Sequence, residues 1–208
     1  TFLVVANLNF WNCSEVSANG SFSIILSGSM HGQLDPCGWK KNPLGGLSRR
    51  FVKIKELQEA GKNPIIVDAG DLLFSTKNIN DTNRKSEIHR AKSIMKGFDK
   101  IGCDAINVGH YEILNGLKFL KDISGNSKIP FISANLRDSK TSKLIFTPYR
   151  IVEKNQLKFG IIGVTNSLPD TCKTIISDNF IDAGNKYIKE LSNKTDFLIM
   201  LVNANRDT

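Results

Sequence analysis

The sequence lacks the signals of several familiar protein classes. Its four cysteines form no CxxC pair, which argues against a zinc ribbon and a haem-attachment motif. It has no apolar run of about 18 residues, no heptad pattern and no internal repeat, so neither a transmembrane helix nor a coiled coil nor a solenoid is expected. P-loop, GxGxxG and GxSxG motifs are also absent.

Histidine is scarce and the net charge is positive. The chain has three histidines, and its 28 Lys and Arg against 20 Asp and Glu give a net charge of +8. Such an excess attracts anions such as nucleotides, although the same charges can simply be spread over solvated faces. No basic run is interleaved with aromatic residues, so nucleic acid is not an expected partner.

The first 20 residues differ from the rest of the chain. They open on an apolar stretch, and Val16-Ser17-Ala18 is typical of a signal-peptide cleavage site. This pattern predicts a periplasmic or secreted protein, with a short apolar strand or arm as the alternative. We therefore expect residues 1–20 to be a leader or an N-terminal arm, and residues 21–208 to form one domain.

Short β-rich runs alternate with helical patterns along this domain. Strands are predicted over 22–26, 63–69, 105–108, 129–134, 144–152, 157–164 and 196–202, and helices over 47–60, 85–101, 114–123 and 182–191. The alternation predicts an α/β fold with a layered, mostly parallel or mixed sheet and helices on both faces. No helix follows the last strand, so we expect a domain that is incomplete at its C-terminus.

Three motifs stand where predicted strands end, which is where α/β sheets place their chemistry. They read Ser-Met-His-Gly at 29–32, Asp-Ala-Gly-Asp at 68–71 and Gly-His-Tyr-Glu at 109–112. Further segments follow the same order and spacing: 45–50, 102–109, 133–136 and 159–165. Together they resemble the secreted 5′-nucleotidases of the calcineurin-like metallophosphoesterase superfamily.

This resemblance implies a metal site. In that family two divalent metals activate a water and clamp the phosphate. The candidate metal ligands that survive in this chain are His31, Asp71 and His110. Two imidazoles and a carboxylate suit one Zn, Mn or Fe ion. The alternative is that no metal binds and that the three side chains are hydrogen-bonded remnants.

Three other motif positions depart from the family pattern. Ser29 stands where the family has Asp, and Tyr111 and Asn203 stand where it has His. A phenol with a reference pKa of about 10 carries no positive charge at neutral pH. We therefore expect a catalytically impaired 5′-nucleotidase-like module, with no catalytic residue assigned, that acts as a binding or structural subunit of a secreted assembly. The alternative is a metal-dependent phosphoester hydrolase acting on nucleotides. Expected partners are a nucleotide or phosphate and a protein of the same assembly.

Several single residues carry further expectations. The sequence Cys37-Gly38-Trp39 resembles a subgroup with Cys-Gly-Cys or Cys-Gly-selenocysteine at this point, so Trp39 is either genuine or a misread selenocysteine codon. In the first helix the apolar stripe is assigned to Leu47, Phe51, Ile54 and Leu57. Arg49 and Arg50 are expected to form surface salt bridges, Asp68 and Cys103 to be buried, and His89 to face solvent.

Overall fold

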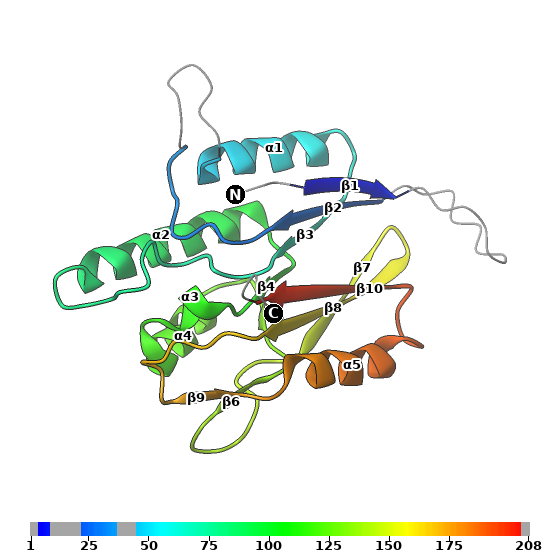
Figure 1. Ribbon diagram of the computed structural model, residues 1–208. Helices are drawn as coiled ribbons and strands as arrows, with labels where there is room; N and C mark the ends of the chain where they lie inside the picture. Colours follow the sequence, from blue (N-terminus) through cyan, green and yellow to red (C-terminus); the bar gives the residue numbers. More distant parts are fainter. Residues whose placement is uncertain (1–3, 9–21, 37–44, 205–208) are drawn as a thin grey trace.

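The computed structural model describes residues 4–8, 22–36 and 45–204, with the backbone alone for residues 4–8. Its elements are arranged as Figure 1 shows. Residues 9–20 of the predicted leader or arm, and Cys37 and Trp39, lie outside the described residues. In chain order the elements are β1 (Val4–Leu8), β2 (Phe22–Ser27), α1 (Leu47–Glu59), β3 (Ile65–Asp68), α2 (Arg84–Ile101), β4 (Ala105–Asn107), α3 (His110–Ile113), α4 (Gly116–Gly125), β5 (Phe131–Ile132), β6 (Leu136–Asp138), β7 (Tyr149–Lys154), β8 (Leu157–Thr165), β9 (Ile175–Ser177), α5 (Phe180–Leu191) and β10 (Phe197–Asn203).

The strands are divided between two main sheets. The larger sheet has the order β1-β2-β3-β4-β5, in which β2 to β5 run parallel and β1 is antiparallel to β2. The second sheet has the order β10-β8-β7, with β10 parallel and β7 antiparallel to β8. Strands β6 and β9 form a small separate pair.

Apolar side chains fill the space between the two sheets. Val67 and Ile132 of the larger sheet pack in one cluster with Phe159, Ile161 and Leu201 of the smaller one. Helices α1 and α2 lie on the outer side of the larger sheet and α5 lies on the outer side of the smaller one (Figure 1). The predicted α/β class, with mixed sheets and helices on both faces, is therefore confirmed.

The division into two sheets begins at a tight hairpin. Asn155 and Gln156 both have positive φ angles, 53° and 65°, and they connect β7 to β8 in antiparallel pairing. Two consecutive residues in this conformation are typical of a type I′ turn, whose twist matches that of paired strands. Strand β8 thus starts a sheet with β7 rather than extending the row from β2 to β5.

The long helices begin and end close to their predicted bounds. Helix α2 ends at Gly102, whose φ of 79° is the left-handed conformation that glycine adopts without a Cβ penalty. Helices α1 and α2 come so close at Gly97 that an added Cβ would lie 2.2 Å from Leu47 Cδ2. None of the helices in the described ranges has both the length and the apolar character needed to cross a membrane.

Candidate functional site

The loops that follow β2 and β3 are joined through their backbones. The amide N–H of Ser29 donates to the Gly70 carbonyl at 2.8 Å, and that of His31 donates to the Asp71 carbonyl at 2.9 Å. The parallel pairing of β2 with β3 brings both loops to the same edge of the sheet. The first two sequence motifs therefore lie side by side at the carboxyl ends of their strands.

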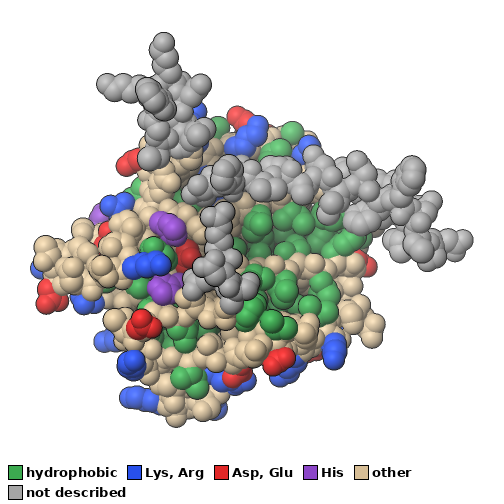
Figure 2. Space-filling view, in the orientation of Figure 1, with side chains coloured by type: hydrophobic (Ala, Val, Ile, Leu, Met, Phe, Trp, Pro, Cys, Tyr) green, Lys and Arg blue, Asp and Glu red, His purple; other side chains and the backbone are tan. Residues whose placement is uncertain are grey.

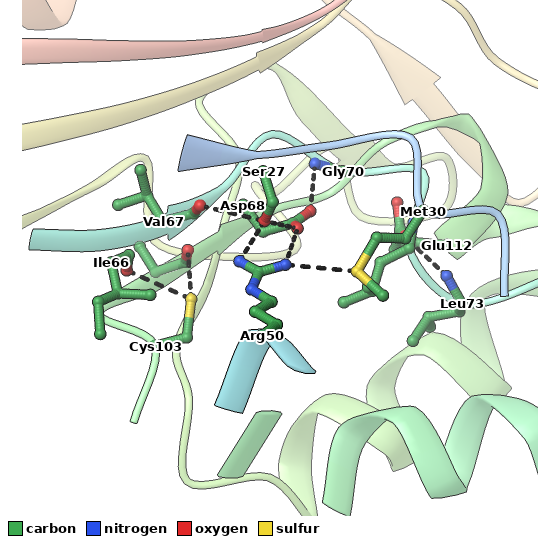
Figure 3. A network of polar contacts seen from close by, with 12 residues as sticks. Ser27, Met30, Arg50, Ile66, Val67, Asp68, Gly70, Leu73, Cys103 and Glu112 are labelled. Carbon is green, nitrogen blue, oxygen red and sulfur yellow. Dashed lines mark hydrogen bonds and ion pairs between the residues drawn. The ribbon is translucent and has the colours of Figure 1, made fainter. Parts of the chain in front are cut away.

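Glu112 connects the second motif to the third. Its buried carboxylate accepts hydrogen bonds from the backbone N–H groups of Asp71 and Gly109, both at 2.8 Å. It also accepts a hydrogen bond from the Leu72 N–H at 2.6 Å. A further hydrogen bond comes from the Leu73 N–H at 3.2 Å (Figure 3). Burial raises the pKa of Glu112 to about 7, and the charge of Asp71 acts in the same direction. One carboxyl group thus holds the turn after β3 against the turn after β4.

Three non-glycine residues of these loops have left-handed backbone conformations. The φ angles are 52° at Ser29, 45° at His31 and 59° at Asp71. Such conformations cost on the order of 1–3 kcal/mol each and persist where the surrounding structure fixes them, often at functional sites. The hydrogen bonds between the two loops provide this restraint.

The ring of Tyr111 lies against the ring of His31. Their centroids are 4.4 Å apart and the planes are inclined by 20°, which is a stacked arrangement. Tyr111 is buried, His31 is exposed, and the Tyr111 backbone N–H donates to Asp71 Oδ1 at 2.9 Å. Burial raises the pKa of the Tyr111 phenol, and the nearby Asp71 charge raises it further. The phenol is therefore neutral at physiological pH.

His110 is half-buried and has partners of its own. Its Nδ1 lies 3.2 Å from Ser167 Oγ, and its backbone N–H donates to Asn203 Oδ1 at 3.2 Å. Burial lowers the pKa of the imidazole, the Asp71 charge opposes this shift, and the Lys77 charge adds to it. Figure 2 shows histidine side chains on one face of the molecule with a cationic side chain beside them. The His110 imidazole is neutral at neutral pH.

Two of these partners, Ser167 and Lys77, were not predicted from the sequence. Ser167 lies 57 residues from His110 in the chain, and no motif marks it. The one available signal was its position two residues after β8, at the carboxyl end of a parallel strand. Lys77 lies in the turn-rich stretch before α2 and had no distinguishing feature.

The family resemblance implies a metal ion. The arrangement of the side chains shows whether the candidate ligands lie close enough together to hold one. Within residues 4–8, 22–36 and 45–204, no three His, Cys, Asp or Glu residues are grouped so that they could hold a metal ion. His31 stacks on Tyr111, Asp71 accepts a backbone N–H, and His110 lies beside Ser167. The described residues thus do not supply a three-ligand site in this arrangement. Metal binding by His31, Asp71 and His110 stays a prediction.

A buried polar network lies beneath the Gly70–Asp71 turn (Figure 3). Arg50 from α1 donates to the Ser27 hydroxyl, which in turn donates to Asp68, and Arg50 Nη1 lies 3.7 Å from Asp68 Oδ2. The Asp68 carboxylate also accepts the Gly70 N–H at 2.9 Å. Burial raises the pKa of Asp68, and the Arg50 charge opposes that shift. The network positions the turn that carries Asp71.

The burial of single side chains corrects two expectations and confirms three. Arg50 is buried rather than part of a surface salt bridge, and Phe51 is exposed rather than part of the apolar stripe of α1. Asp68 and Cys103 are buried and His89 is exposed, as predicted. Burial raises the pKa of the Cys103 thiol to about 12, so this thiol is unreactive at neutral pH.

Known proteins share both this sequence and this fold. A 5′-nucleotidase of Vibrio parahaemolyticus is 34% identical over 165 residues, which cover 78% of this chain and 27% of that protein. The chain is a relative of the 5′-nucleotidases, and it has the fold of a calcineurin-like phosphoesterase. The chain therefore spans about a quarter of the length of this relative. No protein-family model matches the sequence.

Solved structures support the fold of this 5′-nucleotidase relative. A 5′-nucleotidase precursor from Thermus thermophilus superposes with a TM-score of 0.74 at 21% identity, over 87% of this chain and 36% of that one. The calcineurin-like phosphoesterase YfkN from Bacillus subtilis gives a TM-score of 0.68 at 21% identity, over 87% of this chain and 61% of that one. At this level of identity the likeness shows the fold alone.

Proposed function

We propose that this chain is a 5′-nucleotidase-like module with an impaired hydrolytic site, serving as a binding or structural subunit of a secreted assembly. The observation that carries the proposal is the stack of Tyr111 on His31, with ring centroids 4.4 Å apart. A neutral phenol occupies the position where the family resemblance places a second imidazole. It can neither ligate through a ring nitrogen nor supply a positive charge to a phosphate.

Two further side chains support the impairment. Ser29 presents an exposed neutral hydroxyl where the resemblance places an anionic carboxylate. Asn203 is buried, and its amide oxygen already accepts the His110 backbone N–H at 3.2 Å. Loss of an anionic and an imidazole ligand weakens metal affinity strongly, because Zn, Mn and Fe ions are held by carboxylate and imidazole donors.

The same proposal covers ligand and location. A nucleotide or a phosphate is the proposed small-molecule partner, supported by the related 5′-nucleotidase and by the net charge of +8. A periplasmic or secreted location is supported by the signal-peptide-like start of the sequence and by the solved relative described as a precursor. A protein partner in the assembly would hold the module in place.

A second candidate is a metal-dependent phosphoester hydrolase acting on nucleotides. What favours it is that His31, Asp71 and His110 stand on adjoining loops, and that burial keeps the His110 imidazole in the neutral form that binds metals. One divalent Zn, Mn or Fe ion would be held by these three side chains. This candidate requires His31, Asp71 and His110 to move closer together than they are in the described arrangement.

Elemental mass spectrometry of protein purified from its native source separates the two candidates. An impaired module is expected to contain well under about one equivalent of Zn, Mn or Fe and to release no phosphate from nucleoside monophosphates when these metals are added. The triple variant Ser29→Asp, Tyr111→His and Asn203→His should then bind metal measurably more tightly. The hydrolase would instead contain metal that is lost in His31→Ala and Asp71→Asn but retained in His89→Ala, a control on the exposed side of α2.

A further inference from the structure

A hollow lies between β5 of the larger sheet and β7 of the smaller one. Its volume is about 280 Å³, and the end of α4, the start of β5 and strand β7 contribute its walls. This volume is just below the range of roughly 300–1,000 Å³ that is usual for the pockets of drug-sized ligands, so the hollow suits a smaller molecule. It borders the amino end of β5, whereas the candidate functional site lies at the carboxyl ends of β2, β3 and β4. The hollow is therefore separate from that site.

Part of the lining is apolar and aromatic. Ile129 and Phe131 line the hollow, and each is 4% exposed. Phe146 is half-buried beside them, with its ring centroid 6.0 Å from that of Phe131 and the two planes inclined by 32°. Aromatic rings pack against one another in offset-stacked or edge-to-face arrangements. This part of the lining thus suits a planar ring.

The charged part of the lining is entirely cationic. Lys128 and Arg150 line the hollow and both are exposed, while no Asp or Glu among the described residues contributes to the lining. Neither cation forms an ion pair with another residue of the described ranges. An anionic group that enters the hollow therefore meets two positive charges that no neighbouring carboxylate offsets.

Strand β7 offers a comparison between a paired and an unpaired cation. Residues 150, 152 and 154 point to the same face of the strand, because side chains alternate between the two faces. On this face Val152 packs in the core between the sheets, and Lys154 Nζ lies 2.6 Å from Asp104 Oδ2. Arg150 has no such partner in the described part of the chain. Its guanidinium is free to bind a ligand.

The loop that carries Lys128 is held in place by Asp99 of α2. Ser127 Oγ donates to Asp99 Oδ1 at 2.8 Å, and the Lys128 backbone N–H donates to the same oxygen at 2.9 Å. The Ile129 N–H in turn donates to Ser127 Oγ at 3.0 Å. A wall that is already ordered loses less conformational freedom when a ligand binds. This side of the hollow is thus preformed.

A second hollow, of about 230 Å³, differs in its charges. It is lined by Arg137 and Lys186, and also by Asp178 and Asp182. Arg137 Nε lies 2.7 Å from Asp178 Oδ2, so this cation is already paired. The second hollow therefore has no excess of positive charge, and Lys186 provides a control for the effect of a single lysine or arginine on ligand binding.

We infer that the hollow between β5 and β7 is a binding site for a small aromatic anion, with one planar ring and one carboxylate or phosphate group. The ring packs against Phe131 and Phe146, and the anionic group is bound by Arg150 with the charge of Lys128 nearby. A guanidinium binds either kind of oxyanion through two parallel hydrogen bonds. The inference does not depend on the proposed function, because the two sites lie at opposite edges of the larger sheet.

Ligand-observed NMR with benzoate tests the inference on the protein of natural length, with EDTA present to remove metals. We expect saturable saturation transfer to benzoate. Benzamide has the same ring without the charge, and acetate has the charge without the ring, so each should bind at least about tenfold more weakly. Phenyl phosphate separates the two kinds of anion: tighter binding than benzoate assigns a phosphate ester, and weaker binding a carboxylate. Benzamide or acetate that binds as tightly as benzoate overturns the inference, and so does the absence of saturable benzoate binding.

Substitutions locate the bound ligand. Arg150→Gln is expected to weaken the binding of benzoate by about tenfold or more, because charge-assisted hydrogen bonds are lost. Arg150 is exposed, so this change should leave the fold intact. Phe146→Leu keeps an apolar side chain but removes the ring, and should weaken the binding of benzoate while leaving that of acetate unchanged.

Lys186→Gln in the second hollow is the matched control and should leave the binding of benzoate unchanged. Equal losses in Lys186→Gln and Arg150→Gln would show attraction by the net charge alone and overturn the inference. Unaltered binding of benzoate in Arg150→Gln overturns it as well. Binding of phenyl phosphate that persists in Arg150→Gln belongs to another site and contradicts the assignment of a phosphate ester to this hollow.

Discussion

Arg50 and Asp68 form a buried ion pair, with Nη1 and Oδ2 3.7 Å apart, that connects helix α1 to the end of strand β3. The guanidinium also lies 4.7 Å from the centre of the Phe98 ring on α2. Asp68 also accepts a hydrogen bond from the Gly70 N–H at 2.9 Å, and this bond connects the ion pair to the turn that carries Asp71. The packing of α1 against α2 therefore helps to fix the position of the Gly70–Asp71 turn.

Replacing Arg50 by leucine should destabilise the fold strongly. Arg50→Leu leaves the Asp68 carboxylate buried without its charged partner, a loss of about 3–5 kcal/mol in the free energy of unfolding. Urea denaturation followed by circular dichroism measures it. Arg49→Leu is the control, because Arg49 is the exposed neighbour, and it should change stability by about 0.5 kcal/mol or less. Equal losses in the two variants would contradict the structural role of the pair.

Replacing Glu112 by glutamine should loosen both turns. In the native chain one carboxylate oxygen of Glu112 accepts hydrogen bonds from the Asp71 and Gly109 N–H groups. In Glu112→Gln an amide NH₂ replaces one of the two carboxylate oxygens. Because NH₂ is itself a donor, buried N–H groups lose their acceptor. The expected loss is about 2–4 kcal/mol in the free energy of unfolding. Thermal and urea unfolding provide the measurement. Glu153→Gln, at an exposed position of β7, should be close to neutral, and a neutral Glu112→Gln would refute the anchoring role.

The protonation of His110 should respond to Lys77. Burial lowers the His110 pKa from its ordinary value of 6.5, and the Lys77 charge lowers it further. Lys77→Gln should therefore raise the midpoint of the His110 NMR titration, and Asp71→Asn should lower it. Lys189→Gln on α5 is the control and should leave it unchanged. An unaltered midpoint in Lys77→Gln would show that this ammonium does not act on the ring.

The same shift sets the sign of a pH dependence. Because the pKa of His110 is depressed in the folded state, the unfolded chain binds its proton more readily. The contribution of the neutral imidazole to stability is complete above pH 6.5 and is lost as the pH falls through the folded-state pKa. In His110→Gln this part of the acid dependence should disappear.

The sequence was sufficient for the longer helices and strands and for the order of the motifs, but not for the three-residue strands β6 and β9. Continuous apolar runs such as those of β3 and β8 identify buried strands, and Gly61 and Gly102 mark the ends of α1 and α2. It was insufficient for the division into two sheets, because period-2 patterns do not say which strand is the neighbour. Helix α3 was missed because four residues are too few for a helical period.

Arg50 shows a signal that was present but misread. It lies three residues after Leu47 and four before Ile54, so helical spacing places it on the same stripe as these two. Hydrophobicity alone favours Phe51 for that stripe, but the structure leaves Phe51 exposed. The stack of Tyr111 on His31 had no comparable signal, because it depends on side-chain directions at the ends of two separate strands.

The four hydrogen bonds that Glu112 accepts from backbone N–H groups couple the motions of two turns. The amide hydrogens of Asp71, Leu72, Leu73 and Gly109 share one acceptor. They can exchange with solvent only when that acceptor withdraws, so all four open in one event. The turns after β3 and β4 thus behave as a single cooperative unit, and a ligand that stiffens either turn slows hydrogen exchange in both.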